Sequence, residues 1–214
     1  MNVTDLAAEG ANKARSECAV SHLVLGGARS GKSAFAEKQM QNWLQQHPGG
    51  CVYYLATAPR SYQIDDSLEP KEDSEMLKRI KHHQQQRPND WLTLEESIFL
   101  ADQLQQLQSQ IASANSHLSR NAPSAVLLDC LTLWMLNIIE ANCREQEVKK
   151  LLDFLEQTQV PIIMVSNEIG LGVVPMGKLS REFVDELGRL HQEVAKRVER
   201  VTFVTAGLPM QLKG

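Results

Sequence analysis

Residues 26–33 have the types and spacing needed to bind a chain of phosphates. They read Gly-Gly-Ala-Arg-Ser-Gly-Lys-Ser and match G-x-x-x-x-G-K-[ST] at every fixed position. Glycines let backbone N–H groups turn inward around phosphate oxygens, and the following helix adds its positive amino end. Lys32 can reach β- and γ-phosphates, and the Ser33 hydroxyl can ligate Mg²⁺. The predicted nucleoside triphosphate site consists of Gly26, Gly27, Ala28, Arg29, Ser30, Gly31, Lys32 and Ser33.

Such a loop binds phosphate only between a buried strand and a helix. The preceding residues 22–25, His-Leu-Val-Leu, form a short apolar run typical of a buried strand. Residues 33–40 predict a helix, with apolar side chains at Phe35, Met40 and Trp43. The alternative is a glycine turn that binds nothing. The order of strand, loop, lysine, serine and helix favours the phosphate site.

Asp129 is a second candidate for this site, because it ends the apolar run 125–129. A carboxylate at the end of a strand beside the P-loop strand can hold Mg²⁺ directly or through water. An Asp at the end of a strand can instead cap the next helix. The P-loop upstream favours the metal role.

Two adjacent histidines, His82 and His83, lie in a segment with helical periodicity. On a helical wheel Met76, Leu77 and Ile80 share one face. His83 falls at the edge of that apolar stripe, so we expect it to pack or to orient its neighbours, whereas His82 points nearly opposite and is free. A neutral imidazole beside a triphosphate could attack phosphorus. The alternative is a pair of solvated histidines.

Apolar runs alternate with helical segments along the chain. The runs are continuously apolar, as expected for parallel strands covered on both faces. Beyond the P-loop strand they occupy residues 51–57, 125–129, 161–166 and 201–205, and shorter strands could lie at 91–95 and 210–212. Helices are expected near residues 100–112, 133–157 and 180–200. The pattern predicts an α/β, P-loop NTPase-like three-layer fold with a mainly parallel sheet.

The chain has 214 residues, of which 43% are hydrophobic, and this suits a single domain. We expect that domain over residues 21–214, with a flexible extension at 1–20 and an inserted loop at about 59–72. A net charge of -4 and few aromatic residues argue against a nucleic-acid binder.

Membrane and secretory signals are missing from the sequence. No apolar run approaches the roughly 20 residues that cross a bilayer, and the first twenty residues hold no secretory apolar core. The cysteines, Cys18, Cys51, Cys130 and Cys143, form no C-x-x-C pair and are expected to be reduced thiols. These features predict a cytoplasmic protein.

Taken together, the motifs resemble those of the bifunctional adenosylcobinamide kinase/adenosylcobinamide-phosphate guanylyltransferase family. The resemblance covers roughly Ser21 to Lys213. Besides the P-loop it rests on Ala56-Thr57, Asp73-x-Glu75-Met76, Arg79-Ile80-x-His82-His83, Arg87-Pro88-x-x-Trp91, residues 128–132, residues 166–175, Arg181-x-Phe183 with Gly188-Arg189, and residues 204–209. Relatives join the Ala-Thr strand end to the Asp-x-Glu-Met helix over only a few residues, so the insertion at 59–72 departs from the family pattern.

The resemblance implies two reactions. A nucleoside triphosphate, ATP or GTP, phosphorylates the aminopropanol hydroxyl of adenosylcobinamide. GTP then donates GMP to adenosylcobinamide phosphate through a guanylylated histidine, here His82, and yields adenosylcobinamide-GDP. The resemblance also implies Mg²⁺, for which the candidate ligands are Ser33 and Asp129, and a homo-oligomer that is commonly a trimer.

The nucleotide contacts implied by the resemblance extend beyond the P-loop. They fall on Ala56, Thr57, Ala58, His83, Gln84, Gln85, Gln86, Glu95 and Asp129. Glu95 has an acceptor suited to N1–H and the N2 amino group of guanine, although a Glu at the end of a strand is otherwise solvated. Asn167 and Glu168 also end a predicted strand, where open α/β sheets bind ligands, or else they form a turn before Gly170.

Two other classes of protein fit parts of the pattern. A different small-molecule P-loop kinase would need Lys32 and Asp129 but no essential His82. A nucleotide-gated binding protein would hydrolyse or retain its nucleotide without modifying a small acceptor.

Overall fold

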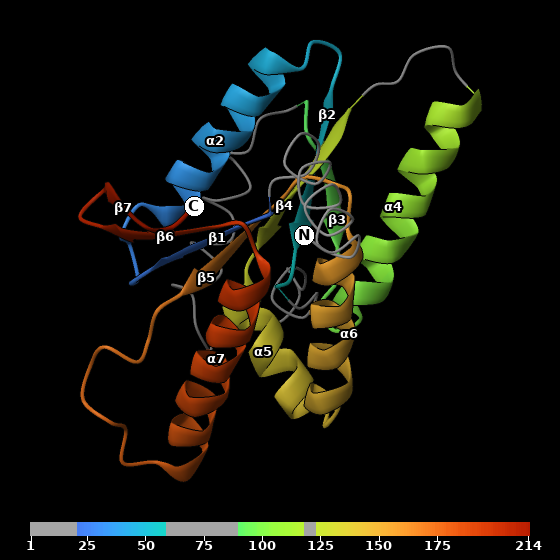
Figure 1. Ribbon diagram of the computed structural model, residues 1–214. Helices are drawn as coiled ribbons and strands as arrows, with labels where there is room; N and C mark the ends of the chain where they lie inside the picture. The colour runs from blue at the N-terminus through green and yellow to red at the C-terminus, as the bar shows by residue number, and fades with distance from the viewer. Residues whose placement is uncertain (1–20, 59–89, 118–122) are drawn as a thin grey trace, which may run out of the picture.

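A computed structural model describes residues 21–58, 90–117 and 123–214, which form one mixed sheet flanked by helices (Figure 1). The described strands are β1 (Ser21–Gly26), β2 (Cys51–Ala56), β3 (Leu92–Glu95), β4 (Ser124–Asp129), β5 (Ile162–Asn167), β6 (Arg200–Thr205) and β7 (Leu208–Lys213). The described helices are α2 (Lys32–Gln46), α4 (Leu100–His117), α5 (Leu131–Glu140), α6 (Arg144–Gln157) and α7 (Lys178–Arg197).

The sheet has the order β3-β2-β4-β5-β1-β6-β7. All neighbouring strands from β3 to β6 are parallel, and β7 runs antiparallel to β6. The predicted α/β fold with a mainly parallel sheet is therefore confirmed. The short strands expected at 91–95 and 210–212 correspond to β3 and β7.

Helices cover both faces of the sheet, which makes the three layers (Figure 1). On one face Val24 of β1 packs in a cluster with Ala36 and Met40 of α2. On the other face Leu23 and Leu25 pack in the larger cluster formed with α4, α5, α6 and α7. Successive side chains of a strand point to opposite faces, so a strand covered on both faces must be apolar throughout.

The single helix expected over residues 133–157 is wrong, because two helices, α5 and α6, occupy this region. Helix α5 ends just before Asn142, which adopts a left-handed φ of 54°. Its backbone N–H donates to the Ile139 carbonyl at 3.0 Å, and the Cys143 N–H donates to the Ile138 carbonyl at 3.0 Å. These two bonds form a Schellman motif, which ends a helix, and Asn tolerates the left-handed conformation that the motif requires.

Several predicted segments lie outside the described residues. They are the extension at 1–20, the insertion at 59–72, the histidines His82 and His83, and Gln84, Gln85 and Gln86. None of the described helices combines the length and the apolarity needed to cross a bilayer.

Candidate active site

Five neighbouring strands bring their carboxyl ends to the same edge of the sheet. Gly26, the last residue of β1, pairs with Asn167, the last residue of β5. Ala56, at the end of β2, pairs with Asp129 on one side and with Glu95 on the other. Ligands of open α/β sheets bind outside this edge. The predicted P-loop, Asp129 and Glu95 therefore share it.

The loop between β1 and α2 has the shape of a phosphate cradle. Its backbone is left-handed at Arg29, with φ 57°, and at Gly31, with φ 93°. A β-carbon at Gly31 would lie 3.2 Å from the Cα of Gly207, so the crowded site and the positive φ both favour glycine. The Gly207 N–H donates to the Ser30 carbonyl at 2.9 Å, which ties the turn between β6 and β7 to the outside of the loop.

Polar side chains of the loop are available to an anion. The Nζ of Lys32 donates to the Gly27 carbonyl at 3.2 Å and so lies against the loop. Burial lowers the pKa of Lys32, while the nearby carboxylate of Asp129 raises it. The Ser30 hydroxyl is buried and has no hydrogen-bond partner among the described residues. A phosphate oxygen is the acceptor that such donors would take.

Asp129 is held in place by a neighbouring strand, because the Tyr54 hydroxyl of β2 donates to its Oδ2 at 2.8 Å. The peptide bond that follows Asp129 is cis. Thr57 fixes the same turn: its hydroxyl donates to the Cys130 carbonyl at 2.7 Å and accepts from the Cys130 N–H at 2.9 Å. Asn137 in turn donates to the Thr57 carbonyl at 2.9 Å.

Thr57 was predicted as a nucleotide contact, and its side chain is fully buried in these internal hydrogen bonds. Ala56 is buried beside it, whereas Ala58 is partly exposed. Glu95 is exposed on β3, four strands from β1, which corresponds to ~19 Å along the sheet. The structure therefore groups Asp129 with the P-loop and leaves Glu95 at the far end of the same edge.

Sequence reasoning missed two residues of this site, Tyr54 and Gly207. Tyr54 is a buried, polar-tipped side chain inside a mostly apolar strand, and buried tyrosines usually find a hydrogen-bond partner. Gly207 belongs to an Ala-Gly turn between two strands, but its contact with the P-loop joins residues far apart in the chain.

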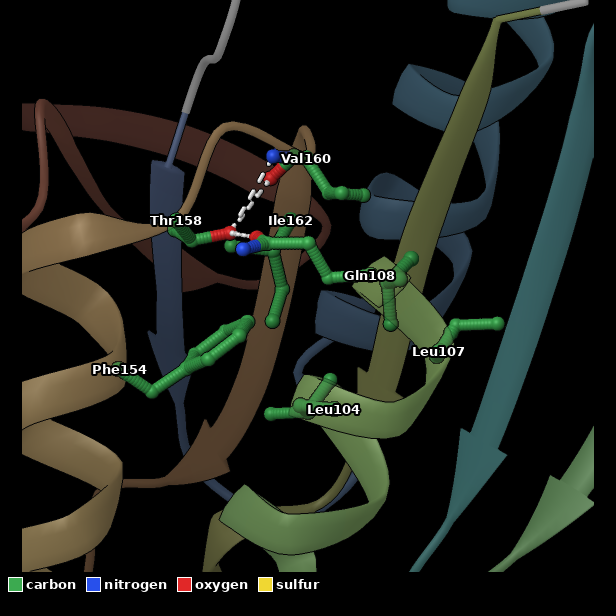
Figure 2. Close-up of a pocket in the computed structure, with 8 residues that line it drawn as sticks. Leu104, Leu107, Gln108, Phe154, Thr158, Val160 and Ile162 are labelled. Atoms are coloured by element: carbon green, nitrogen blue, oxygen red, sulfur yellow. Dashed lines mark hydrogen bonds between the residues drawn. The ribbon is translucent and has the colours of Figure 1, made fainter. Parts of the chain in front are cut away.

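A small crevice lies where α4 and α6 pack against the sheet, near the end of the strands opposite the P-loop (Figure 2). Apolar side chains from α4, α6 and β5 line it, among them Leu104, Phe154 and Ile162. The Thr158 hydroxyl donates to Oε1 of Gln108 at 3.0 Å across the crevice. The crevice is too small for a water molecule, and Ile162 is the first residue of β5. It lies near the amino ends of the strands, away from the P-loop.

The family model described as cobinamide kinase / cobinamide phosphate guanyltransferase matches residues 22–212. The chain belongs to this family. Membership confirms the resemblance drawn from the motifs and decides against the two alternative classes. This protein is a bifunctional enzyme of cobalamin biosynthesis, with cobinamide kinase and cobinamide phosphate guanylyltransferase activities.

Similar proteins cover nearly the whole chain. The bifunctional adenosylcobalamin biosynthesis protein CobP of Pseudomonas aeruginosa is 44% identical over 195 residues, which span 90% of this chain and 96% of that protein. The CobU proteins of Escherichia coli and Salmonella typhimurium carry the same description. They are 32% identical over 207 residues and 31% identical over 213 residues, each spanning 89% of this chain and 98% of the relative.

Proposed function

We propose that the P-loop, residues 26–33, binds the triphosphate of the phosphoryl donor, and that His82 carries GMP from GTP to adenosylcobinamide phosphate. One observation supports the first assignment above all: the loop joins a buried strand to α2 with Lys32 lying against it. The second assignment rests on the sequence motif, because His82 is outside the described residues.

In the kinase step the chain supplies position and charge. Backbone N–H groups at the amino end of α2 hold phosphate oxygens, and Lys32 neutralises charge on the β- and γ-phosphates. The aminopropanol hydroxyl attacks the γ-phosphorus, the bond to the leaving oxygen breaks, and a nucleoside diphosphate leaves. Fixed donors stabilise the charge on the transferred group without having to reorganise.

The residues at the edge fit Mg²⁺. Ser33 lies in the first turn of α2, and Asp129 presents a carboxylate whose Oδ2 is fixed by Tyr54. The described residues hold no group of three or more His, Cys, Asp or Glu side chains that could cage a metal. That is consistent with Mg²⁺, which is usually bound by one or two carboxylates together with substrate phosphates and water. When bound, the ion would neutralise phosphate charge.

In the second step a histidine divides one displacement into two. His82 attacks the α-phosphorus of GTP and pyrophosphate leaves. An oxygen of adenosylcobinamide phosphate then attacks the phosphoramidate, which releases His82 and forms adenosylcobinamide-GDP. We assign further nucleotide contacts to Ala56, Thr57, Ala58, His83, Gln84, Gln85 and Gln86, of which Thr57 would act by holding the turn after β4, because its side chain is buried. The exposed position of Glu95, distant from the P-loop, suits recognition of guanine at the far end of the nucleotide.

Labelled GTP tests this assignment. Incubation with α-labelled GTP and Mg²⁺, without cobinamide, should leave an acid-labile label on the protein. GTP labelled on the γ-phosphate should leave none, because that phosphate departs with pyrophosphate. A protein that makes adenosylcobinamide-GDP without ever carrying the label would contradict the covalent histidine.

We also propose a homotrimer in the cytoplasm. The trimer is supported by the family resemblance and is checked by light scattering on the purified protein. The location is supported by the thiols of Cys51, Cys130 and Cys143, which are free. Thiols of this kind are kept reduced in the cytosol.

A further inference from the structure

The loop from β5 to α7, residues 168–177, carries an unusual concentration of exposed apolar side chains. Val173 is 96% exposed and Met176 97% exposed. Leu171 and Val174, and Leu179 just beyond the loop, are also more than two-thirds exposed. The loop projects from the edge of the sheet before α7 begins (Figure 1). Single exposed apolar residues are normal, but a cluster of them marks a surface that binds something.

This loop, which we call the β5–α7 arm, begins beside the phosphate site. The Glu168 N–H donates to the carbonyl of Gly26, the first residue of the P-loop, at 3.0 Å. β5 itself lies between β1 and β4, the strands that end in the P-loop and in Asp129. The amino end of the arm, at Glu168, therefore lies next to the P-loop, and the rest of the arm extends away from the sheet toward the start of α7 (Figure 1).

A buried polar network leads to the first residue of the arm. The Ser166 hydroxyl lies 3.1 Å from Oγ1 of Thr132 and 2.7 Å from Nε2 of His191. The other ring nitrogen, Nδ1 of His191, is buried without a hydrogen bond among the described residues. It lies 3.7 Å from Oε2 of Glu168. His191 itself is only 6% exposed.

The hydrogen bonds of this network fit a neutral His191. A carboxylate faces Nδ1 of His191, so this nitrogen carries the proton and Nε2 accepts from Ser166. Burial lowers the pKa of His191, and Glu168 raises it. The other oxygen of Glu168, Oε1, accepts from the Gly170 N–H at 2.6 Å. A backbone hydrogen bond thus holds Oε1 of Glu168, Oε2 faces His191, and the carboxylate remains partly exposed at the sheet edge.

We propose that the β5–α7 arm binds cobinamide. The exposed apolar side chains contact the face of the corrin ring, and Glu168 accepts a hydrogen bond from the hydroxyl that is phosphorylated. His191 is a positioning residue, which acts through Glu168. The proposal rests on the P-loop as the donor site, because the hydroxyl must meet the γ-phosphate there. A ring of this size needs an open surface, and the crevice of Figure 2 cannot hold it.

The double variant Val173→Ser/Met176→Ser tests the apolar surface. Both side chains are almost fully exposed, so the fold should not change. We expect KM for cobinamide to rise at least tenfold, with KM for ATP and labelling by α-labelled GTP unchanged within twofold. Equilibrium dialysis with cobinamide, read by its visible absorbance, should show the same loss. The matched control is Leu212→Ser, an exposed apolar residue of β7 near the other edge, which should change none of these.

Glu168→Gln and His191→Phe test the proposed hydrogen bond between Glu168 and the hydroxyl that is phosphorylated. Each should lower kcat for cobinamide phosphorylation at least tenfold while KM for ATP and labelling by GTP stay within twofold. A role confined to folding would lower labelling and the melting temperature along with kcat. An unchanged kcat in folded Glu168→Gln would remove this residue from the proposal.

Two results would overturn the arm as the acceptor site. One is a double variant whose affinity for cobinamide in dialysis and whose KM for cobinamide both equal those of the wild-type protein. The other is a smaller assembly by light scattering with labelling lost, which would make the arm a contact between copies of the chain. Failure of the wild-type protein to take label from GTP would contradict the covalent histidine alone, since dialysis still reports on the arm.

Discussion

The backbone of Gly26 faces the carbonyl oxygen of Val204 so closely that a β-carbon at residue 26 would lie 2.4 Å from that oxygen. It would also lie 2.5 Å from the Ser30 hydroxyl. Gly26 and Val204 are paired across β1 and β6, so neither backbone can move away alone. By contrast, a β-carbon at Gly27 would meet no described atom within 4 Å. Of these two adjacent glycines, only Gly26 has no room for a side chain.

Gly26→Ala should disrupt the P-loop, whereas Gly27→Ala should be tolerated. The added methyl at residue 26 must push β1 from β6 or displace Ser30, at a cost of about 1–3 kcal/mol in the free energy of unfolding. We expect ATP affinity, measured by calorimetry, to fall at least tenfold in Gly26→Ala and to stay within about twofold in Gly27→Ala. Equal behaviour of the two variants would show that β6 does not constrain the loop.

Lys32→Met should separate ligand binding from stability. The ammonium group is partly buried, and burial lowers its pKa, so its charged form is not favoured by the surrounding protein. Removing it should leave the melting temperature equal or higher, while ATP affinity and kinase kcat/KM fall at least tenfold. The control is Lys38→Met on the exposed side of α2, which should keep the ATP affinity and the kinase kcat/KM of the wild-type protein. Unchanged kinase kinetics in Lys32→Met would rule out the phosphate-site assignment.

Tyr54→Phe should change the response to Mg²⁺. The hydroxyl of Tyr54 fixes Oδ2 of Asp129 at 2.8 Å, and without it the carboxylate is less well oriented. The Mg²⁺ concentration for half-maximal kinase activity should rise several-fold, with most of kcat recovered at saturating Mg²⁺. Tyr53→Phe, on the adjacent residue, is the control. An identical Mg²⁺ curve for Tyr54→Phe would contradict the role of this hydrogen bond in orienting Asp129 toward the ion.

Local signals were sufficient to predict most of the elements and the P-loop. Continuous apolar runs predicted β1, β2, β4, β5 and β6, because burial on both faces affects every residue of such a strand. The helix break at Asn142 was not predicted, since the amphipathic pattern continues on both sides of it. The strand order is also not written in any one segment: β5 enters between β1 and β4 although it follows both in sequence.

The parts of the site that the sequence did not predict are contacts between distant segments. Val204 and Gly207 restrict the P-loop from more than 170 residues away, and Tyr54 reaches Asp129 from another strand. Such contacts depend on register and strand order, which periodicity does not determine. The resemblance implies Thr57 as a nucleotide contact, and the structure adds what the motif does not indicate: its buried side chain holds the turn after β4.

Stability should fall in acid because of His22. Burial, with a smaller effect of Arg200, lowers the pKa of His22 from 6.5 to about 4, and its Nε2 shares a hydrogen bond with Thr202 at 2.8 Å. Between these two pH values the unfolded chain binds a proton that the folded chain does not. The free energy of unfolding should therefore decrease as pH falls from 6.5 to 4, by up to ~3 kcal/mol from this residue.

Urea unfolding at several pH values measures this effect. His22→Gln can keep a hydrogen bond to Thr202 but cannot take up a proton, so its stability should depend less on pH over the same window. His191, whose pKa burial also lowers, contributes in the same direction in both proteins. Parallel curves for the variant and the wild-type protein would contradict the assignment to His22.

The two activities should separate at His82. Phosphorylation transfers the γ-phosphoryl group directly to the cobinamide hydroxyl and needs no covalent enzyme intermediate, so His82→Asn should keep it. GMP transfer should vanish, because an amide nitrogen is not the nucleophile or leaving group that imidazole provides. Chromatography of the products should show adenosylcobinamide phosphate accumulating without its GDP derivative, and no label from α-labelled GTP.

His83→Asn, the adjacent control, should retain some label. Loss of both activities in folded His82→Asn would mean that this residue supports a shared nucleotide site, and retention of both would remove it from the mechanism.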